Sequence, residues 1–406
     1  MAENLEKKAP NVRFKGFTDV WEQRKLKGIA SFSKGNGYSK KSLLENGNPI
    51  ILYGQLYTNY QTIISEVNTF AKVNEKSVIS SGGEVIVPAS GETPEDISRA
   101  SVVRESGIIL GGDLNVIKPF KFLTPPFLAL TISNGASKNQ MVRRAQGKSI
   151  VHLHNSDLKQ IKLFIPKINE QKKISSFFQK LDTLLVLYQR KIGLLQQLKK
   201  AMLQRLFPDT DTYPKLRFDG FSDPWEQHKL GEVTTSYSGG TPKAGEEKYY
   251  SGNIPFIRSA EINSSTTELF ISELGLNSSS AKLVSKGMIL YALYGATSGE
   301  VGISKIDGAI NQAILALTPV EKYDSIFISQ YLKLIKGKIV QKYLQGGQGN
   351  LSASIVKNID IKFPDCDEQL KISQFLTKFD TLITLQQHKL DNMHELKKFM
   401  LQNLFL

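Results

Sequence analysis

The chain contains one sequence frame that occurs twice. Residues 10–26 read PNVRFKGFTDVWEQRKL and residues 214–230 read PKLRFDGFSDPWEQHKL, with 11 of 17 positions identical. Residues 166–207 and 364–405 agree at 22 of 42 positions. The repeat is about 200 residues long, far above the roughly 20–50 residues of a solenoid repeat, so the sequence predicts a tandem pair of domains. The inserts between the matched ends are much less alike, which suggests two different binding surfaces on one frame.

The net charge of the chain is +14 and its pI is about 9.4. This excess of positive charge favours polyanions as partners, nucleic acid first and an anionic membrane surface second. A merely basic protein with neither partner is the plain alternative. No long block of consecutive Lys or Arg occurs, so any nucleic-acid surface must be built by folding.

Three features bear on where the chain works. No apolar run approaches the roughly 18 residues of a membrane span. The N-terminal residues lack the apolar core of a signal peptide. The one cysteine, Cys366, cannot form an internal disulfide, which fits a reducing compartment. We therefore expect a cytoplasmic protein.

Short apolar runs separated by Gly, Ser, Asn and Pro predict strands joined by loops in both inserts. The expected strands are Ile50–Tyr53, Glu84–Val87, Gly107–Leu110, Leu114–Ile117, Ile254–Ile257, Met288–Leu293 and Ala313–Leu317. Helices are expected around Lys40–Asn46, after Pro125-Pro126 and over Ile326–Lys342. Each insert is therefore predicted to be an α+β (mixed α/β) globule, with a topology that the sequence leaves open.

After each insert, the spacing of the apolar residues along the sequence changes. Apolar residues recur in steps of four and three, which is the heptad seam of a coiled coil; Lys199 interrupts it in the first copy, and Gln386 and Lys397 interrupt it in the second. In the first copy they are Ile174, Phe178, Leu181, Leu185, Tyr188, Ile192, Leu195 and Met202; in the second they are Ile372, Leu376, Phe379, Ile383, Leu390, Met393, Met400 and Leu404. Pro166 and Pro364 precede the two helices and mark their starts.

A second apolar stripe lies beside this seam. Its members are Leu184, Leu187, Leu194, Leu198, Leu382, Leu385 and Leu396. A two-stranded coil needs only the narrow seam, so the wider apolar face suggests that another protein packs there. The alternative is that the two helices simply pack on each other.

The linker between the copies decides the direction of the helices. Each helix has roughly 35 residues and should be about 50 Å long. The linker Pro208–Tyr213 has six residues and spans at most about 20 Å, so it cannot return along the helix. We expect antiparallel helices, a pseudo-twofold repeat, and two globules separated by the helix pair. The expected domains are an arm (1–20), a globule (21–165), a helix (166–207), a linker (208–224), a second globule (225–363) and a second helix (364–406).

The sequence holds no catalytic signature that we would defend. Neither a phosphate-binding G-x-x-x-x-G-K-[ST] loop nor a G-x-G-x-x-G loop occurs. Thr124-Pro-Pro-Phe127 superficially resembles an amino-methyltransferase motif, but threonine stands where an amide or carboxylate belongs, and a helix start explains it. His152 and His154 have no third ligand at a recognisable spacing.

Several segments combine Lys or Arg with Asn, Gln, Ser or Tyr, a mixture that suits phosphate positioning and base-edge reading. We read these segments as loops, although each one alone could be an ordinary solvated loop. The candidate DNA-binding residues are Lys34, Tyr38, Lys40, Lys41, Lys138, Arg143, Arg144, Gln146, Lys148, Thr241, Lys243, Arg258, Tyr294, Thr297, Gln345, Gln348 and Asn350.

Further motifs mark the two halves of the chain. Trp21-Glu-Gln-Arg-Lys-Leu26 and Trp225-Glu-Gln-His-Lys-Leu230 open the two halves. The second insert contains Ser238-Gly-Gly-Thr-Pro-Lys243, Tyr294-Gly-Ala-Thr297 and Ala309-Ile-Asn-Gln-Ala313, and the first has Lys34-Gly-Asn-Gly37 in place of Gly-Gly-Thr-Pro. Taken together, these motifs resemble the specificity (S) subunit of a type I restriction-modification system and its target recognition domains. The likeness spans nearly the whole chain.

This resemblance implies a non-catalytic DNA-specificity subunit. Each recognition domain would read one half of a bipartite DNA target. The helices would set the spacing and dock two methyltransferase (M) subunits, and restriction (R) subunits would join that core. S-adenosylmethionine, ATP and Mg²⁺ would belong to those partners, with no cofactor or metal in this chain.

Two other functions stay open on the residues alone. One is a non-catalytic coiled-coil scaffold whose globules bind proteins or glycans. The other is a self-contained DNA methyltransferase or nuclease, against which the missing cofactor loop argues.

Overall fold

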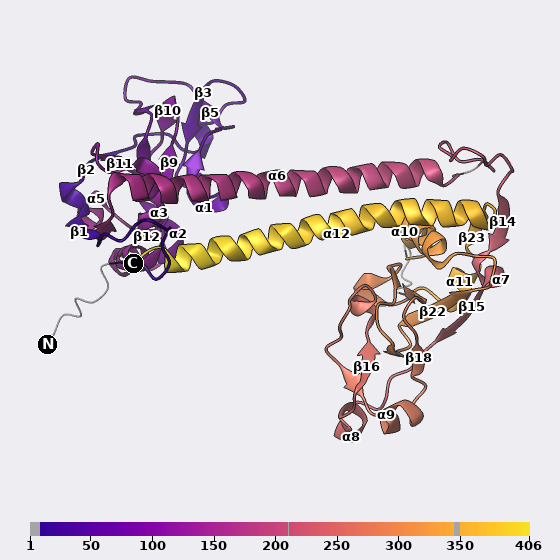
Figure 1. Cartoon of the computed structure of the whole chain (residues 1–406). Helices are drawn as coiled ribbons and strands as arrows, with labels where there is room; N and C mark the ends of the chain where they lie inside the picture. The colour runs from indigo at the N-terminus through magenta and orange to yellow at the C-terminus, as the bar shows by residue number, and fades with distance from the viewer. Residues whose placement is uncertain (1–8, 210, 345–349) are drawn as a thin grey trace. The chain divides into compact units, whose positions relative to one another are not determined.

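The structure, a computed structural model, describes residues 9–209, 211–344 and 350–406. The chain forms two compact units. Unit 1 comprises Met1–Gln189 with His388–Leu406, and unit 2 comprises Arg190–Gln387. The two predicted long helices are present as α6 (Ile168–Leu206) and α12 (Cys366–Asn403), drawn in magenta and yellow in Figure 1. Each of them begins in one unit and ends in the other.

Unit 1 contains two main sheets and several short helices. The five-stranded sheet has the order β2 (Ala30–Lys34), β11 (Leu114–Pro119), β7 (Glu84–Pro88), β9 (Ser101–Val103) and β4 (Ile63–Ile64). The four-stranded sheet has the order β5 (Phe70–Ala71), β3 (Asn48–Ile51), β10 (Ser106–Leu110) and β6 (Ile79–Ser81). Two small ladders pair β1 (Glu22–Lys25) with β13 (Lys162–Ile165) and β8 (Ser90–Gly91) with β12 (Val151–His152). The helices are α1 (Gln55–Thr58), α2 (Pro94–Ile97), α3 (Pro125–Ile132), α4 (Gly135–Arg144) and α5 (Asn155–Leu158).

Unit 2 repeats most of this framework. One sheet has the order β15 (Thr234–Ser238), β22 (Ile314–Pro319), β19 (Ile289–Ala292) and β20 (Val301–Ile303). The other has the order β17 (Phe270–Ile271), β16 (Ile254–Ile257), β21 (Gly308–Ile310) and β18 (Lys282–Val284). A ladder pairs β14 (Glu226–Lys229) with β23 (Asp360–Phe363). The helices are α7 (Leu230–Val233), α8 (Glu247–Tyr250), α9 (Glu273–Asn277), α10 (Ser325–Leu344) and α11 (Ala353–Lys357).

The two inserts, unlike in sequence, share most of one mixed α/β topology, and unit 1 adds strand β4 and the β8–β12 ladder. The central pairs β10–β3 and β16–β21 are parallel, whereas β11–β2 and β22–β15 are antiparallel over five residue pairs each. This common strand order confirms the predicted mixed fold class and supplies the topology that the sequence left open.

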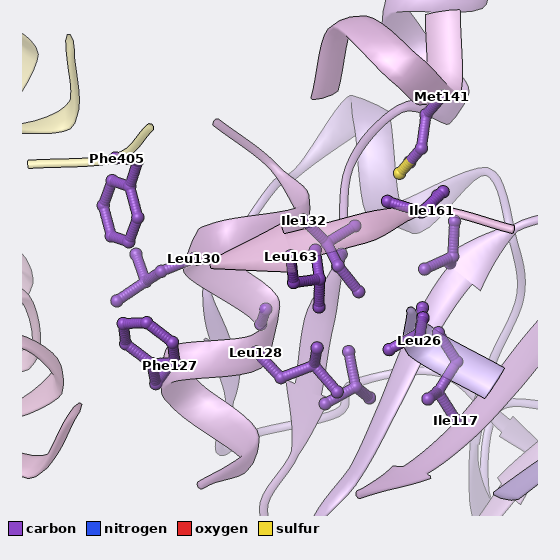
Figure 2. Packing of buried hydrophobic residues seen from close by; sticks show 14 of the residues in the cluster. Leu26, Ile117, Phe127, Leu128, Leu130, Ile132, Met141, Ile161, Leu163 and Phe405 are labelled. Atoms are coloured by element: carbon purple, nitrogen blue, oxygen red, sulfur yellow. The ribbon is translucent and has the colours of Figure 1, made fainter. Parts of the chain in front are cut away.

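The core of each unit joins its sheet to the long helices. In unit 1, Leu26, Phe127, Met141 and Leu163 pack in one buried cluster that also contains Phe405, two residues after the end of α12 (Figure 2). In unit 2, the residue directly after α6 is Phe207, whose ring contacts Trp225 and Phe327. Phe207 and Phe405 occupy the same position in the repeat. Each long helix is therefore followed by an aromatic residue that packs into the core of a unit.

Within each unit the helix segments run antiparallel. In unit 1, the ring of Phe178 contacts that of Phe405, and Asp182 forms an ion pair of 2.6 Å with Lys397. In unit 2, Lys199 forms an ion pair of 2.6 Å with Asp380. Later positions on α6 thus meet earlier positions on α12, as predicted.

A buried ion pair ties the segment before each insert to a long helix. Arg13 donates two hydrogen bonds of 2.6 Å to Glu170, and Arg217 donates bonds of 2.9 and 2.8 Å to Glu368. The side chains of Glu170 and Glu368 are 2% and 0% exposed. Both pairs are part of the duplicated frame.

Two local predictions were wrong. Residues 40–46 were expected to be helical, but only Lys40–Ser42 form a 3-10 turn. Leu44 instead pairs with Phe70 as a β-bridge, and Gly47 has a φ of +152°, so the segment leads directly into a strand. Residues 138–148 were expected to be a loop, but residues up to Arg144 lie on α4, because the buried Met141 fixes that helix against the core.

Candidate nucleic-acid interface

The first predicted loop of unit 1 is held against the strand framework by its backbone. The N–H of Gly35 donates to the carbonyl of Leu114 at 3.0 Å, and the N–H of Asn36 donates to the carbonyl of Leu110 at 3.1 Å. A Cβ added at Gly35 would lie 1.9 Å from the carbonyl oxygen of Gly111. Only glycine allows this approach, so the loop starts from a fixed position.

The side chains of this loop tie it to a second loop. The hydroxyl of Tyr38 donates to the carbonyl of Lys72 at 2.8 Å, and the amide of Asn36 donates to the carbonyl of Lys76 at 2.9 Å. Tyr38 has a φ of +58°, a left-handed backbone that costs energy for a residue other than glycine. These bonds hold the residue there, beside a groove of about 400 Å³ between the loops.

The two loops together form what we call the lysine edge, which consists of Lys34, Lys40, Lys41, Lys72 and Lys76. All five side chains are exposed. The first three lysines were predicted from the sequence, whereas Lys72 and Lys76 were not. The polar run Lys72-Val-Asn-Glu-Lys76 between two short strands was the available signal.

The other predicted segment of unit 1 begins on a helix. Its residues Lys138, Arg143 and Arg144 are on α4, which packs against α2, α3 and α5, and Gln146 and Lys148 follow it. The backbone of Gln146 pairs with that of His152. No hydrogen bond among the described residues joins this segment directly to the lysine edge, although Asn155 on the neighbouring α5 donates to the carbonyl of Ser33, next to Lys34, at 2.8 Å.

In unit 2, the matching loop follows the same construction. A Cβ at Gly239 would lie 1.8 Å from the carbonyl oxygen of Ile310. The hydroxyl of Thr241 donates to the side-chain carbonyl of Gln312 at 2.8 Å, beside the exposed Lys243. The amide nitrogen of the exposed Gln312 is a donor suited to a base edge or a phosphate. Gln312 belongs to a motif that the sequence analysis named, but it was not among the predicted DNA-binding residues.

Arg258, also predicted to bind DNA, is paired with carboxylates inside unit 2. Its guanidinium contacts Glu261 at 2.8 Å and Glu268 at 2.6 Å. The hydrogen bond from Arg258 lowers the pKa of Glu261 from 4.5 to about 2, and both carboxylates raise the pKa of Arg258. Its positive charge is therefore already matched by two negative ones.

A third polar surface of unit 2 lies around Tyr294. The backbones of Tyr294 and Asn350 form a β-bridge, and the hydroxyl of Thr297 donates to the carbonyl of Tyr294 at 3.4 Å. The structure thus brings three predicted residues together. Gln345 and Gln348, the other two predicted residues of this group, lie outside the described residues.

The predicted apolar stripe is exposed on both long helices. Its seven leucines are between 41% and 55% exposed, whereas the seam residues Ile174, Phe178 and Leu376 are at most 1% exposed. Phe399 on α12 is 51% exposed and adds to the stripe within unit 1. The seam thus forms the contact between the helices, and the stripe is left uncovered.

Within residues 9–209, 211–344 and 350–406, no group of three or more His, Cys, Asp or Glu side chains is placed to hold a metal ion. The helices of these same ranges include none that is both long and apolar enough to span a bilayer.

The chain thus consists of a duplicated mixed α/β framework with basic and polar loops, joined to two long helices. The type I restriction modification DNA specificity domain matches this chain twice, at residues 18–198 and 222–394. The chain therefore belongs to the family of type I restriction-modification specificity (S) subunits.

Relatives and solved structures agree with this assignment. The type I restriction enzyme MjaVIII specificity subunit of Methanocaldococcus jannaschii is 23% identical over 352 residues, which cover 81% of this chain and 80% of that protein. The S subunit of a type I restriction-modification system from M. genitalium has a TM-score of 0.67 at 16% identity, with 98% and 99% of the two chains covered. A chain of another type I system, solved in work on complex assembly and conformational transition, has a TM-score of 0.56 at 18% identity, with 94% and 96% covered. Both solved structures support the fold.

Proposed function

We propose that each unit reads one half of a bipartite DNA target through its own loops. The observation that carries this proposal is one strand framework used twice with different loop chemistry: a lysine edge in unit 1, and Thr241 with Gln312 in unit 2. A common framework fixes the position of the loops, while different side chains select different bases.

We further propose that the long helices set the spacing between the half-sites and dock two M subunits, which R subunits then join. The exposed leucine stripe supports the docking role, because exposed apolar faces of this kind mark protein contacts. The chain itself would act without a cofactor in the cytoplasm. S-adenosylmethionine, ATP and Mg²⁺ would be bound by its partners, so methylation, ATP hydrolysis and cleavage would be theirs.

Methylome sequencing of cells with and without this chain tests the proposal. We expect one split methylated motif, with two short defined parts around an undefined gap, that disappears when the chain is deleted. An unchanged methylome in cells that express active M subunits would contradict it.

A further inference from the structure

The two recognition segments differ in charge although they share a framework. Residues 21–165 contain 18 Lys and Arg against 11 Asp and Glu, a net charge of +7. Residues 225–363 contain 14 Lys and Arg against 12 Asp and Glu, a net charge of +2. The positive charge of the whole chain is therefore not shared equally by the two halves that would read DNA.

Ion pairing increases this difference. Among the cations of residues 21–165, all of which are described, Arg24 and Arg99 are in ion pairs. In the described part of residues 225–363, the paired cations include Lys229, Lys243, Lys248, Arg258, Lys336 and Lys338. More of the positive charge in the second segment is already matched by carboxylates.

The difference in charge between the two segments is largest at the loops that occupy corresponding positions in the two units. The loops at residues 34–41 and 72–77 carry the five exposed lysines of the lysine edge and one acidic residue, Glu75. Residues 238–250 and 272–282 of unit 2 carry three lysines and three glutamates. One of those glutamates, Glu246, lies 3.5 Å from both Lys243 and Lys248.

We propose that the lysine edge of unit 1 supplies most of the phosphate neutralisation of the chain, whereas unit 2 recognises its half-site with little of it. This inference rests on the proposed function, in which both units bind duplex DNA. Lysines that neutralise phosphates release counterions from DNA, which makes binding dependent on salt. Hydrogen bonds from Thr241 and Gln312 release no counterions. Non-specific affinity and salt dependence should therefore reside in unit 1.

Two matched variants of the full chain test this division. K40Q/K41Q/K72Q/K76Q removes four exposed lysines from the lysine edge, and K243Q/K248Q/K282Q/K286Q removes four exposed lysines from unit 2. Binding to a fluorescent duplex of arbitrary sequence would be measured by anisotropy between roughly 50 and 200 mM KCl, a range over which phosphate contacts change affinity strongly. Thermal melting would verify that both variants fold.

Each phosphate contact contributes about 0.9 to the slope of log Kd against log salt concentration. We expect the unit 1 variant to lower this slope by about 2 or more, and the unit 2 variant to lower it by less than about 1. Equal losses, or a larger loss from the unit 2 variant, would overturn the unequal division and leave the proposed function standing. Absence of DNA binding by the unchanged chain at the lowest salt would overturn the proposed function itself.

Discussion

Gly35 and Gly239 occupy the same position in the two units, and in both a backbone carbonyl lies where a side chain would be. The carbonyl oxygens of Gly111 and Ile310 stand 1.9 and 1.8 Å from the Cβ that alanine would add. Backbone cannot yield as the end of a flexible side chain can. Each recognition loop can therefore lie this close to its sheet only because glycine has no side chain at this position.

We predict that Gly35→Ala and Gly239→Ala each destabilise their own unit by about 1–3 kcal/mol, the usual cost of forcing atoms into filled space. Urea unfolding would measure this. Gly193→Ala is the matched control, because Gly193 lies within α6 with no neighbouring atom within 4 Å of its added Cβ. That change should stabilise the chain by about 0.5–1 kcal/mol. Equal effects at Gly35 and Gly193 would contradict the packing described.

The pairing of Arg258 with Glu261 predicts a pH dependence for unit 2. The folded-state pKa of Glu261, about 2, is below its ordinary value of 4.5. The stabilisation is complete above about pH 4.5 and is lost as the pH falls towards 2. Glu261→Gln should therefore be less stable than the parent chain at pH 7, and the difference should shrink as the pH falls from about 4.5 and vanish below pH 2. Thermal melting of both chains across this range measures the difference. If the ion pair did not contribute to stability, the difference in melting temperature between the two chains would be the same at every pH.

At the scale of elements, two buried ion pairs connect the repeated segments to the long helices. Removal of Arg217 would leave Glu368, whose side chain is 0% exposed, charged and without its partner. We predict that Arg217→Met costs about 3–5 kcal/mol, and that adding Glu368→Met recovers most of this loss. Denaturant unfolding of both variants measures the recovery. A double variant as unstable as Arg217→Met would show that packing, and not an unpaired charge, is responsible.

The two apolar faces of the long helices are expected to have different roles: the buried seam stabilises the fold, and the exposed stripe binds a partner. Leu181 in the seam is 5% exposed, whereas Leu184 and Leu187 in the stripe are 41% and 53% exposed. We predict that Leu184→Glu with Leu187→Glu leaves the melting temperature within a few degrees of the parent value but abolishes co-purification with an M subunit. Leu181→Glu should instead lower the melting temperature strongly, because it buries an unpaired charge. Retained co-purification of the stripe variant would contradict the docking role.

At the scale of the whole molecule, the repeat of the sequence made the fold class, the two long helices and their antiparallel direction predictable. These features depend on periodicity and linker length, which are local. The sheet order was not predictable, because the pairing of β3 with β10 joins residues more than 50 positions apart. Lys72 and Lys76 were missed for a similar reason: hydrogen bonds from Tyr38 and Asn36, far away in the sequence, bring them to the lysine edge.

The central claim is that two independent readers share one frame. Its most direct test is methylome sequencing of cells in which residues 21–165 are replaced by the matching segment of another S subunit. We predict that one half of the methylated motif changes, while the other half and the gap stay the same. A change in both halves, or in neither, would contradict the account.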